Sequence, residues 1–247
     1  MNKIRLVSVA VVLLLAGILL ALMFFIGFSP SEYIGGSCKI KNYRTVKIGD
    51  QIWMAENLNC YVIGSKCYND DPANCAKYGR LYDWATALAL PPKCSGASCA
   101  NQVNAHHRGV CPVDWHIPSN EEWDILYSFA GDTIAEVADD TISISGPYEN
   151  PTAGKRLKAK EGWLNCGSPG SGKIYLCEDS FGFFALPGGI GNAEGFSSNI
   201  GSYGFWWGID EHDHLMAYGR GLAYNSDYAS WLKRSKNDLF SVRCLHD

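Results

Sequence analysis

The sequence lacks the short patterns by which an enzyme or a structural zinc site is usually identified. It contains no G-x-S-x-G nucleophile elbow, no Walker phosphate loop and no H-E-x-x-H zinc motif. No two of its ten cysteines are spaced as C-x-x-C, the arrangement that structural zinc sites usually show. We therefore expect neither an enzyme nor a cysteine-bound metal.

Charge is also scarce. Charged side chains make up 19% of the 247 residues, the formal net charge is −4 at pH 7, and Lys and Arg form no run. The basic field that attracts nucleic acid is missing, so nucleic acid is excluded as a partner. The hydrophobic content of 47% is ordinary for a globular protein and is sufficient for a core.

One long hydrophobic run is present, at the amino terminus. Leu6–Phe28 carries no charged residue, and at about 1.5 Å per helical residue it covers a hydrocarbon core roughly 30 Å thick. Lys3 and Arg5 precede it, which predicts a cytoplasmic amino terminus. Because the run is long and lacks an A-x-A site, we predict an uncleaved transmembrane signal anchor over 1–28, with a cleaved leader as the alternative. A short linker over 29–37 and one exported domain over 38–247 follow.

The cysteines agree with export. All ten follow the anchor, as expected for a chain matured in an oxidising compartment, so we predict that they form disulfides. Three pairs are close in sequence with turn-forming residues between their members: Cys67–Cys75, Cys94–Cys99 and Cys166–Cys177. The remaining assignment is Cys38–Cys60 and Cys111–Cys244.

The order of the expected elements indicates an α+β fold. Two β-rich runs flank the Gly49-Asp50 turn and predict a hairpin over 45–54. A helix over 83–90 is expected between Asp83 and Pro91, and a second helix starts at a capping box, Ser119 to Glu122. Short, aromatic-rich antiparallel strands are expected after residue 150, at 183–186, 204–207, 216–218 and 239–243.

Five ordered segments resemble one known family. They are Thr45–Asn59, Cys75–Tyr82, Cys111–Ser119, Phe181–Gly189 and Phe240–Cys244. Together they are similar to the Fibrobacter succinogenes major paralogous domain, over roughly residues 40–247. The resemblance implies an abundant bacterial envelope protein and does not imply an activity.

A more distant likeness concerns the segment 115–123, which resembles the R-L-P-T-x-x-E-W element of formylglycine-generating, sulfatase-modifying proteins. This likeness implies a single disulfide-rich C-type-lectin-like domain in which the first and last parts meet, as a Cys111–Cys244 bridge would require. Those enzymes bind copper through a close pair of late cysteines, and 201–242 contains no cysteine here. We therefore carry over the fold and not the reaction.

Aromatic side chains supply the candidate ligand-binding residues. Trp53, Trp84, Trp115 and Trp123 fall on predicted strand or helix faces and are expected in the core. Other aromatics lie among Gly, Ser and Asn, where their rings can stack on a sugar or anchor a protein. The candidates are Trp206, Trp207, Tyr224, Tyr228 and Trp231, of which the adjacent Trp206 and Trp207 point to opposite sides if they are in a strand.

Metal ligands are sparse. On an extended chain His212 and His214 share a face and can chelate zinc or copper, although a solvated acidic loop is the simpler interpretation. His106-His107 is a weaker candidate because adjacent side chains diverge. Asp70-Asp71 and Asp139-Asp140 lack the full calcium-loop pattern and are interpreted as turns, so no cofactor is expected.

These observations favour an envelope-anchored, extracytoplasmic binding or adhesion module. The expected ligand is a cell-wall or plant polysaccharide, or an envelope protein. One alternative is a divergent formylglycine-generating oxidoreductase that uses another metal centre, at His212 and His214. A second alternative is a structural envelope component that associates with itself.

Overall fold

The computed structural model describes residues 43–131, 135–136, 148–166, 176–192, 194–195 and 197–247, all within one compact unit, Ser37–Asp247. None of the helices in this part of the chain is both long and apolar enough to span a membrane. The predicted anchor Leu6–Phe28 lies outside the described residues, as do Cys38 and Asp139-Asp140.

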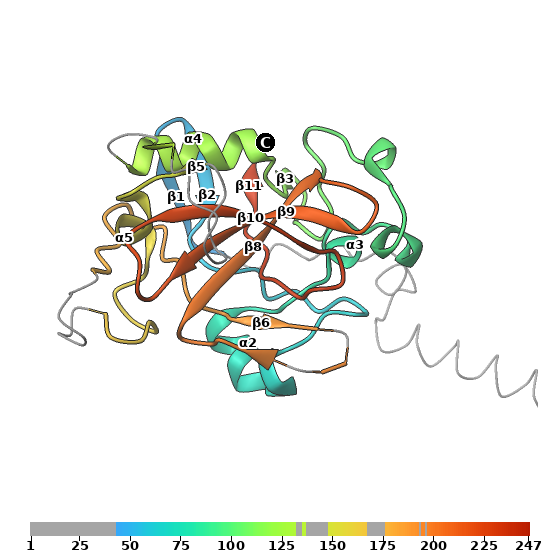
Figure 1. Cartoon of the computed structure of the whole chain (residues 1–247), viewed down its shortest axis with the longest axis horizontal. Helices are drawn as coiled ribbons and strands as arrows, with labels where there is room; N and C mark the ends of the chain where they lie inside the picture. The colour runs from blue at the N-terminus through green and yellow to red at the C-terminus, as the bar shows by residue number, and fades with distance from the viewer. Residues whose placement is uncertain (1–42, 132–134, 137–147, 167–175, 193, 196) are drawn as a thin grey trace, which may run out of the picture. The chain divides into compact units, whose positions relative to one another are not determined.

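The described part contains four α-helices and several short strands. Figure 1 shows how they are arranged. The α-helices are α2 (Pro72–Tyr78), α3 (Trp84–Ala87), α4 (Asn120–Ala130) and α5 (Ala153–Leu157). The 3₁₀ helices are η2 (Tyr68–Asp70), η3 (Pro92–Ser95) and η4 (Ala100–Gln102). The strands are β1 (Thr45–Ile48), β2 (Gln51–Met54), β3 (Trp115–His116), β4 (Ala135–Glu136), β5 (Tyr148–Glu149), β6 (Ile190–Gly191), β7 (Ser197–Ser198), β8 (Tyr203–Glu211), β9 (Met216–Ala223), β10 (Ala229–Ser235) and β11 (Leu245–His246).

The first sheet joins the two ends of the domain, in the strand order β1-β2-β11-β3. The predicted hairpin is confirmed: β1 and β2 are antiparallel, and Gly49 takes the positive φ of +60° that the tight turn requires. Leu245 of β11 pairs with both Trp53 of β2 and His116 of β3. The carboxyl-terminal strand therefore lies between segments from the first half of the chain.

The second sheet is an antiparallel meander, β10-β9-β8, that contains most of the longer strands. It confirms the strands expected at 204–207 and 216–218. The prediction of strands at 183–186 and 239–243 is wrong. These segments form only isolated bridges, such as Ala185 with Lys158 and Phe240 with Tyr82. Two two-stranded sheets, β4-β5 and β6-β7, complete the described sheets.

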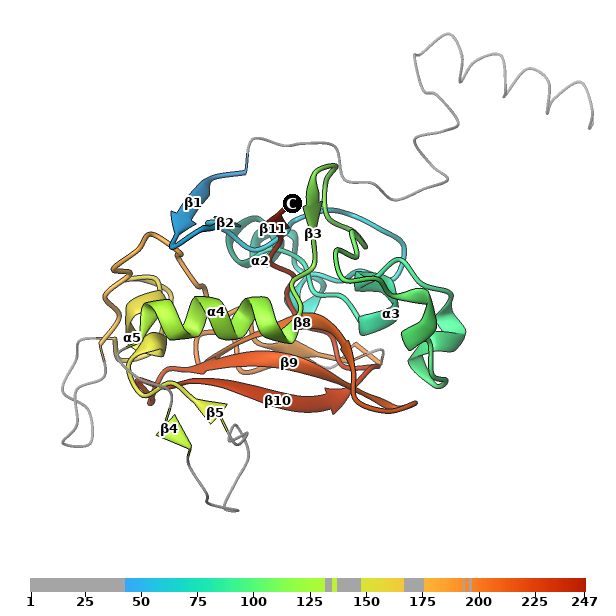
Figure 2. The ribbon, with the colours of Figure 1, turned by 90° about the horizontal axis from the view of Figure 1, so that it is seen from above.

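Helix α4 connects the two larger sheets and starts at the predicted capping box. Ser119 accepts a hydrogen bond from the Glu122 backbone N–H, and the Glu122 carboxylate accepts one from the Ser119 N–H. Its Trp123 ring lies 4.8 Å from that of Trp53 in β2 and 6.5 Å from that of Trp206 in β8. Figure 2 shows α4 between the hairpin and the meander.

The other helices are short, and the sequence prediction of two helices missed α2 and α5. Asp83 caps α3 as predicted, through the Thr86 N–H, but the helix ends at Ala87 rather than at residue 90. Ala89 has a φ of +53°, and Pro91 follows shortly after, so the chain leaves the helical region early. The fold is α+β, as predicted.

Disulfides tie the loops to this framework. The structure contains Cys67–Cys75, Cys94–Cys99, Cys111–Cys244 and Cys166–Cys177, as predicted. The predicted Cys38–Cys60 bridge involves Cys38, outside the described residues. Cys111–Cys244 spans 133 residues and links the segment before β3 to the segment before β11.

Candidate functional site

Trp206 and Trp207 are core residues, so their predicted contact with a ligand is wrong. They are 1% and 0% exposed, and they point to opposite faces of β8. Trp206 packs in one cluster with Trp123, whereas Trp207 stacks on Phe240 in the other, at 4.3 Å between ring centroids. Both faces of β8 are covered, which is why neither indole reaches the surface.

The other three predicted aromatics lie at or near the surface. Tyr224 is half-buried against the core, and Tyr228, 40% exposed, lies in the turn before β10. Trp231 belongs to β10 and not to a loop, with its ring centroid 5.5 Å from that of Tyr218. Their contact with a ligand stays a prediction.

The predicted metal pair, His212 and His214, lies in the β8–β9 turn. Asp213 between them accepts hydrogen bonds from the N–H groups of Leu215 and Met216, at 2.8 and 2.9 Å, and so shapes this turn. His212 instead contacts the Tyr218 hydroxyl at 3.0 Å. Within the described residues, the pair is not part of a group of three or more potential metal ligands.

The acidic pair Asp70-Asp71, which the sequence analysis interpreted as a turn, has structural roles. Asp71 caps α2 by accepting a hydrogen bond from the Ala73 N–H at 2.9 Å. Asp70 forms an ion pair with Lys66 at 3.8 Å.

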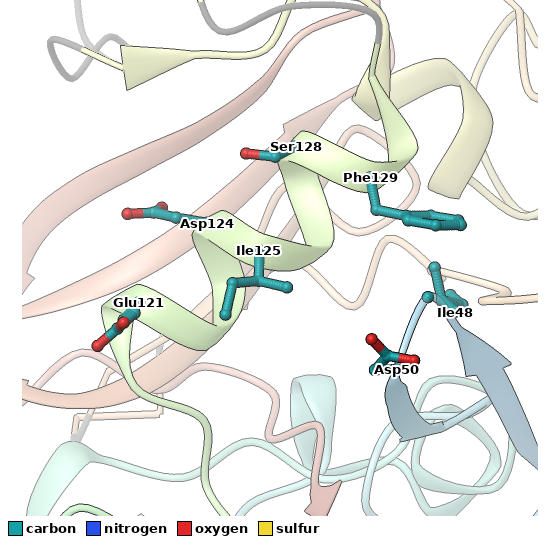
Figure 3. A pocket seen from close by; sticks show the side chains of 8 residues that line it. Ile48, Asp50, Glu121, Asp124, Ile125, Ser128 and Phe129 are labelled. Carbon is teal, nitrogen blue, oxygen red and sulfur yellow. The ribbon is translucent and has the colours of Figure 1, made fainter.

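A groove runs between the β1–β2 turn and the outer face of α4, with a volume of about 1030 Å³ (Figure 3). Ile125 and Phe129, one helical turn apart, are 50% and 53% exposed in it. Phe129 points toward Ile48 in Figure 3 and also contacts Phe181 edge-on, at 5.7 Å. A Cβ at Gly49 would lie 3.1 Å from the Phe129 ring, so the glycine allows the ring to rest on the turn. The Phe129 ring thus lies between the β1–β2 turn and Phe181.

The polar lining of the groove is acidic. It contains Asp50, Glu121 and Asp124, and none of the described residues that line the groove is Lys or Arg. Asp124 forms an ion pair with buried Arg220 at 3.0 Å, whereas Asp50 and Glu121 are exposed and have no ion pair among the described residues. The groove therefore combines exposed apolar side chains with uncompensated negative charge.

A second polar cluster surrounds His116, at the junction of β3, α4 and the end of the chain. His116 is 1% exposed, and its two ring nitrogens contact Asp247 at 2.6 Å and Glu122 at 2.9 Å. The exposed His106 ring packs on it, with 4.7 Å between ring centroids, and its Nδ1 lies 3.9 Å from the Asp247 carboxylate.

The two carboxylates control the charge of this histidine. Burial alone lowers the pKa of His116, but its hydrogen bonds to Glu122 and Asp247 outweigh burial, and the pKa is raised. Burial raises the pKa of Glu122, but its contacts with His116 and Ser119 dominate, and that pKa is lowered. The two carboxylates thus favour the charged form of the His116 ring over the neutral form.

Sequence reasoning missed both the groove and the His116 cluster. The groove had one available signal: Ile125 and Phe129 lie outside the buried stripe of α4 at i and i+4 spacing. Glu122 was recognised only as a capping residue. No sequence pattern relates His116 to Asp247, which are 131 residues apart.

The family model for the Fibrobacter succinogenes major domain matches residues 46–246. The chain belongs to this family. No curated protein and no solved structure matches the chain.

In this Fibrobacter succinogenes major domain, three of the five segments that carry the resemblance meet at Arg243: Thr45–Asn59, Phe181–Gly189 and Phe240–Cys244. Its guanidinium is buried and donates hydrogen bonds to the carbonyls of Met54 and Phe183 and to the side chain of Asn57. It also lies 4.4 Å from the centre of the Phe183 ring. These residues hold the fold together and are not accessible to a ligand.

Proposed function

We propose that the chain is a binding module of the bacterial cell envelope whose groove receives a protein segment with an apolar side chain flanked by Lys or Arg. The observation that carries this proposal is the combination in one groove of half-exposed Ile125 and Phe129 with carboxylates, with no basic residue among the described lining. The chemistry of the groove thus favours a protein over a polysaccharide.

The two parts of the groove have different roles in binding. Covering Ile125 and Phe129 removes apolar surface from water, and this favours binding by the amount that exceeds the entropy lost on association. Asp50 and Glu121 attract a cationic partner, increase its association rate and disfavour acidic segments. Binding should therefore weaken at high salt without disappearing.

The lectin-like fold and the anchor belong to the same proposal. The pairing of β11 with β2, the position of α4 and the Cys111–Cys244 bridge support a C-type-lectin-like arrangement. The uncharged run Leu6–Phe28 and the paired cysteines support a single-pass envelope protein with its domain outside the cytoplasm. Tyr224, Tyr228 and Trp231 remain the predicted surface for a polysaccharide, which the test below also examines.

A binding titration with purified full-length protein tests the proposal. The probes are a short peptide with Lys on both sides of Leu-Phe, the same peptide with Glu in place of Lys, and a panel of cell-wall polysaccharides. We expect the Lys peptide to bind and the Glu peptide not to bind. Binding of a polysaccharide alone, or equal binding of the two peptides, would contradict the proposal.

Variants locate the binding. Phe129→Ala should lower the affinity for the Lys peptide because it removes an apolar contact. Glu121→Gln should lower this affinity because it removes a negative charge. Ile63→Ala is the matched apolar control because Ile63 is 83% exposed outside the groove, and Glu161→Gln is the charge control. Loss of affinity in the controls equal to that in the groove variants would place the binding elsewhere.

A further inference from the structure

Three potential metal ligands converge beside β3 from separate parts of the chain. The ligand atoms of His106, His116 and Asp247 all lie within 4.8 Å of one another. His116 is buried, whereas the side chains of His106 and Asp247 are 63% and 48% exposed. One ligand is thus fixed in the fold, and two can adjust at the surface.

Glu122 orients the fixed ligand. It contacts Nε2 of His116 at 2.9 Å, while Nδ1 of the same ring faces the Asp247 carboxylate. A histidine that binds a metal usually donates its other ring N–H to a carboxylate, which fixes the tautomer and the orientation of the ring. Zinc binding displaces the proton from Nδ1 of the His116 imidazolium and leaves the proton on Nε2, next to Glu122, so that the Nδ1 lone pair is directed toward Asp247 and His106.

We propose that His106, His116 and Asp247 bind one Zn²⁺ ion, with Glu122 as the carboxylate that orients His116. Two imidazole nitrogens and one carboxylate oxygen are a ligand set that zinc accepts, and the fourth position is left to water on the exposed side. This site is separate from the groove and does not depend on its proposed partner.

The adjustment that the ion requires is small. Tetrahedral zinc ligands about 2.0–2.1 Å from the metal lie about 3.3 Å from one another. The contact between His116 and Asp247 must therefore open from 2.6 Å, and the contact between His106 and Asp247 must close from 3.9 Å. The ligand nitrogens of His106 and His116, which lie within 4.8 Å of each other, must also approach. All three changes can be made by the two exposed side chains, whereas His116 and Glu122 can stay in place.

Calorimetric titration of chelator-treated, full-length protein with Zn²⁺ tests this site. We expect one ion per chain, and at least about a tenfold loss of affinity in His106→Gln and in Asp247→Asn. His214→Gln is the control: it removes an exposed histidine from the other candidate pair, and we expect it to bind zinc like the wild type.

Glu122→Gln separates metal binding from folding. Glutamine still completes a capping box, so the helix should be retained, with a lower melting temperature from the lost charged contact to His116, while zinc affinity falls about 10–100-fold. Less than one Zn²⁺ bound by the wild type, full affinity in His106→Gln, or loss of binding in His214→Gln would each overturn the proposal.

Discussion

Nη2 of Arg243 donates a hydrogen bond to Oδ1 of Asn57 at 2.6 Å, across 186 residues of sequence. The same oxygen accepts a hydrogen bond from the Trp206 indole at 2.9 Å, and the Asn57 amide donates one to the Tyr78 carbonyl at 2.9 Å. Asn57 thereby satisfies three buried groups from distant segments. Burial lowers the pKa of Arg243, which shows that the charged guanidinium is poorly solvated. Removing one of its hydrogen-bond partners should therefore strongly destabilise the folded state.

We expect Asn57→Ala to lower the free energy of unfolding by about 3 kcal/mol or more, because it leaves these groups without a partner in a buried site. Urea unfolding measures the change. Asn101→Ala, at an exposed asparagine, is the control and should stay within about 0.5 kcal/mol of the wild type. An equally small change in the free energy of unfolding for Asn57→Ala would mean that water takes over the hydrogen bonds of the Asn57 side chain.

The disulfides should differ in their contribution to stability because they close loops of very different length. By loop entropy, the Cys111–Cys244 bridge with a separation of 133 contributes about 5 kcal/mol, and the Cys94–Cys99 bridge with a separation of 5 about 2 kcal/mol. Replacing each pair by Ala and comparing the unfolding free energies measures the difference. Equal losses would show that loop closure does not determine the contribution.

Lys158 should make stability depend on pH. Its ammonium group is buried and donates hydrogen bonds to the carbonyls of Ala223 and Ser226; burial lowers its pKa to about 8, and the charge of Asp227 only partly offsets this. Because the folded pKa lies below the unfolded value of 10.5, the unfolded chain binds the proton more tightly. The resulting penalty is fully present below about pH 8 and disappears as the pH rises toward about 10.5.

The corresponding measurement compares the wild type with Lys158→Met in urea. The stability difference between them should shift by about 2 kcal/mol in favour of the wild type between about pH 7 and about pH 9.5. Subtracting the variant removes the contributions of groups that both proteins share. A difference that is constant with pH would show that Lys158 titrates normally.

Local signals in the sequence predicted part of this fold. Gly49 at the first turn position and the capping box from Ser119 to Glu122 act over a few residues, and the hairpin and α4 are confirmed. The strand expected around Phe240 is wrong because that segment meets different partners one residue at a time, which no local pattern specifies.

The candidate site was less predictable because it depends on which surfaces other elements cover. The uninterrupted run Phe205-Trp206-Trp207 is typical of a strand buried on both faces, and the structure shows that arrangement. The proximity of His116 to Asp247 arises only when β11 pairs with β3.

The turn that carries Tyr228 packs closely on α5. A Cβ at Gly154 would lie 2.2 Å from the Tyr228 carbonyl oxygen, so Gly154→Ala should displace backbone and lower stability by about 1–3 kcal/mol. Gly96→Ala is the matched control, since a Cβ there meets nothing within 4 Å. The melting temperatures of the two variants are compared. Equal melting temperatures would show that the turn can move without loss of stability.

Site-specific photo-crosslinking tests the proposed binding groove most directly. A photoreactive amino acid is placed at Ser128, an exposed groove residue, or at Glu161 outside the groove, in full-length protein in its native cells. We predict a discrete protein adduct from position 128, none from position 161, and loss of the adduct when Asp50 and Glu121 are both changed to Lys. No protein adduct from position 128, or the same adducts from both positions, would contradict the groove as the binding surface.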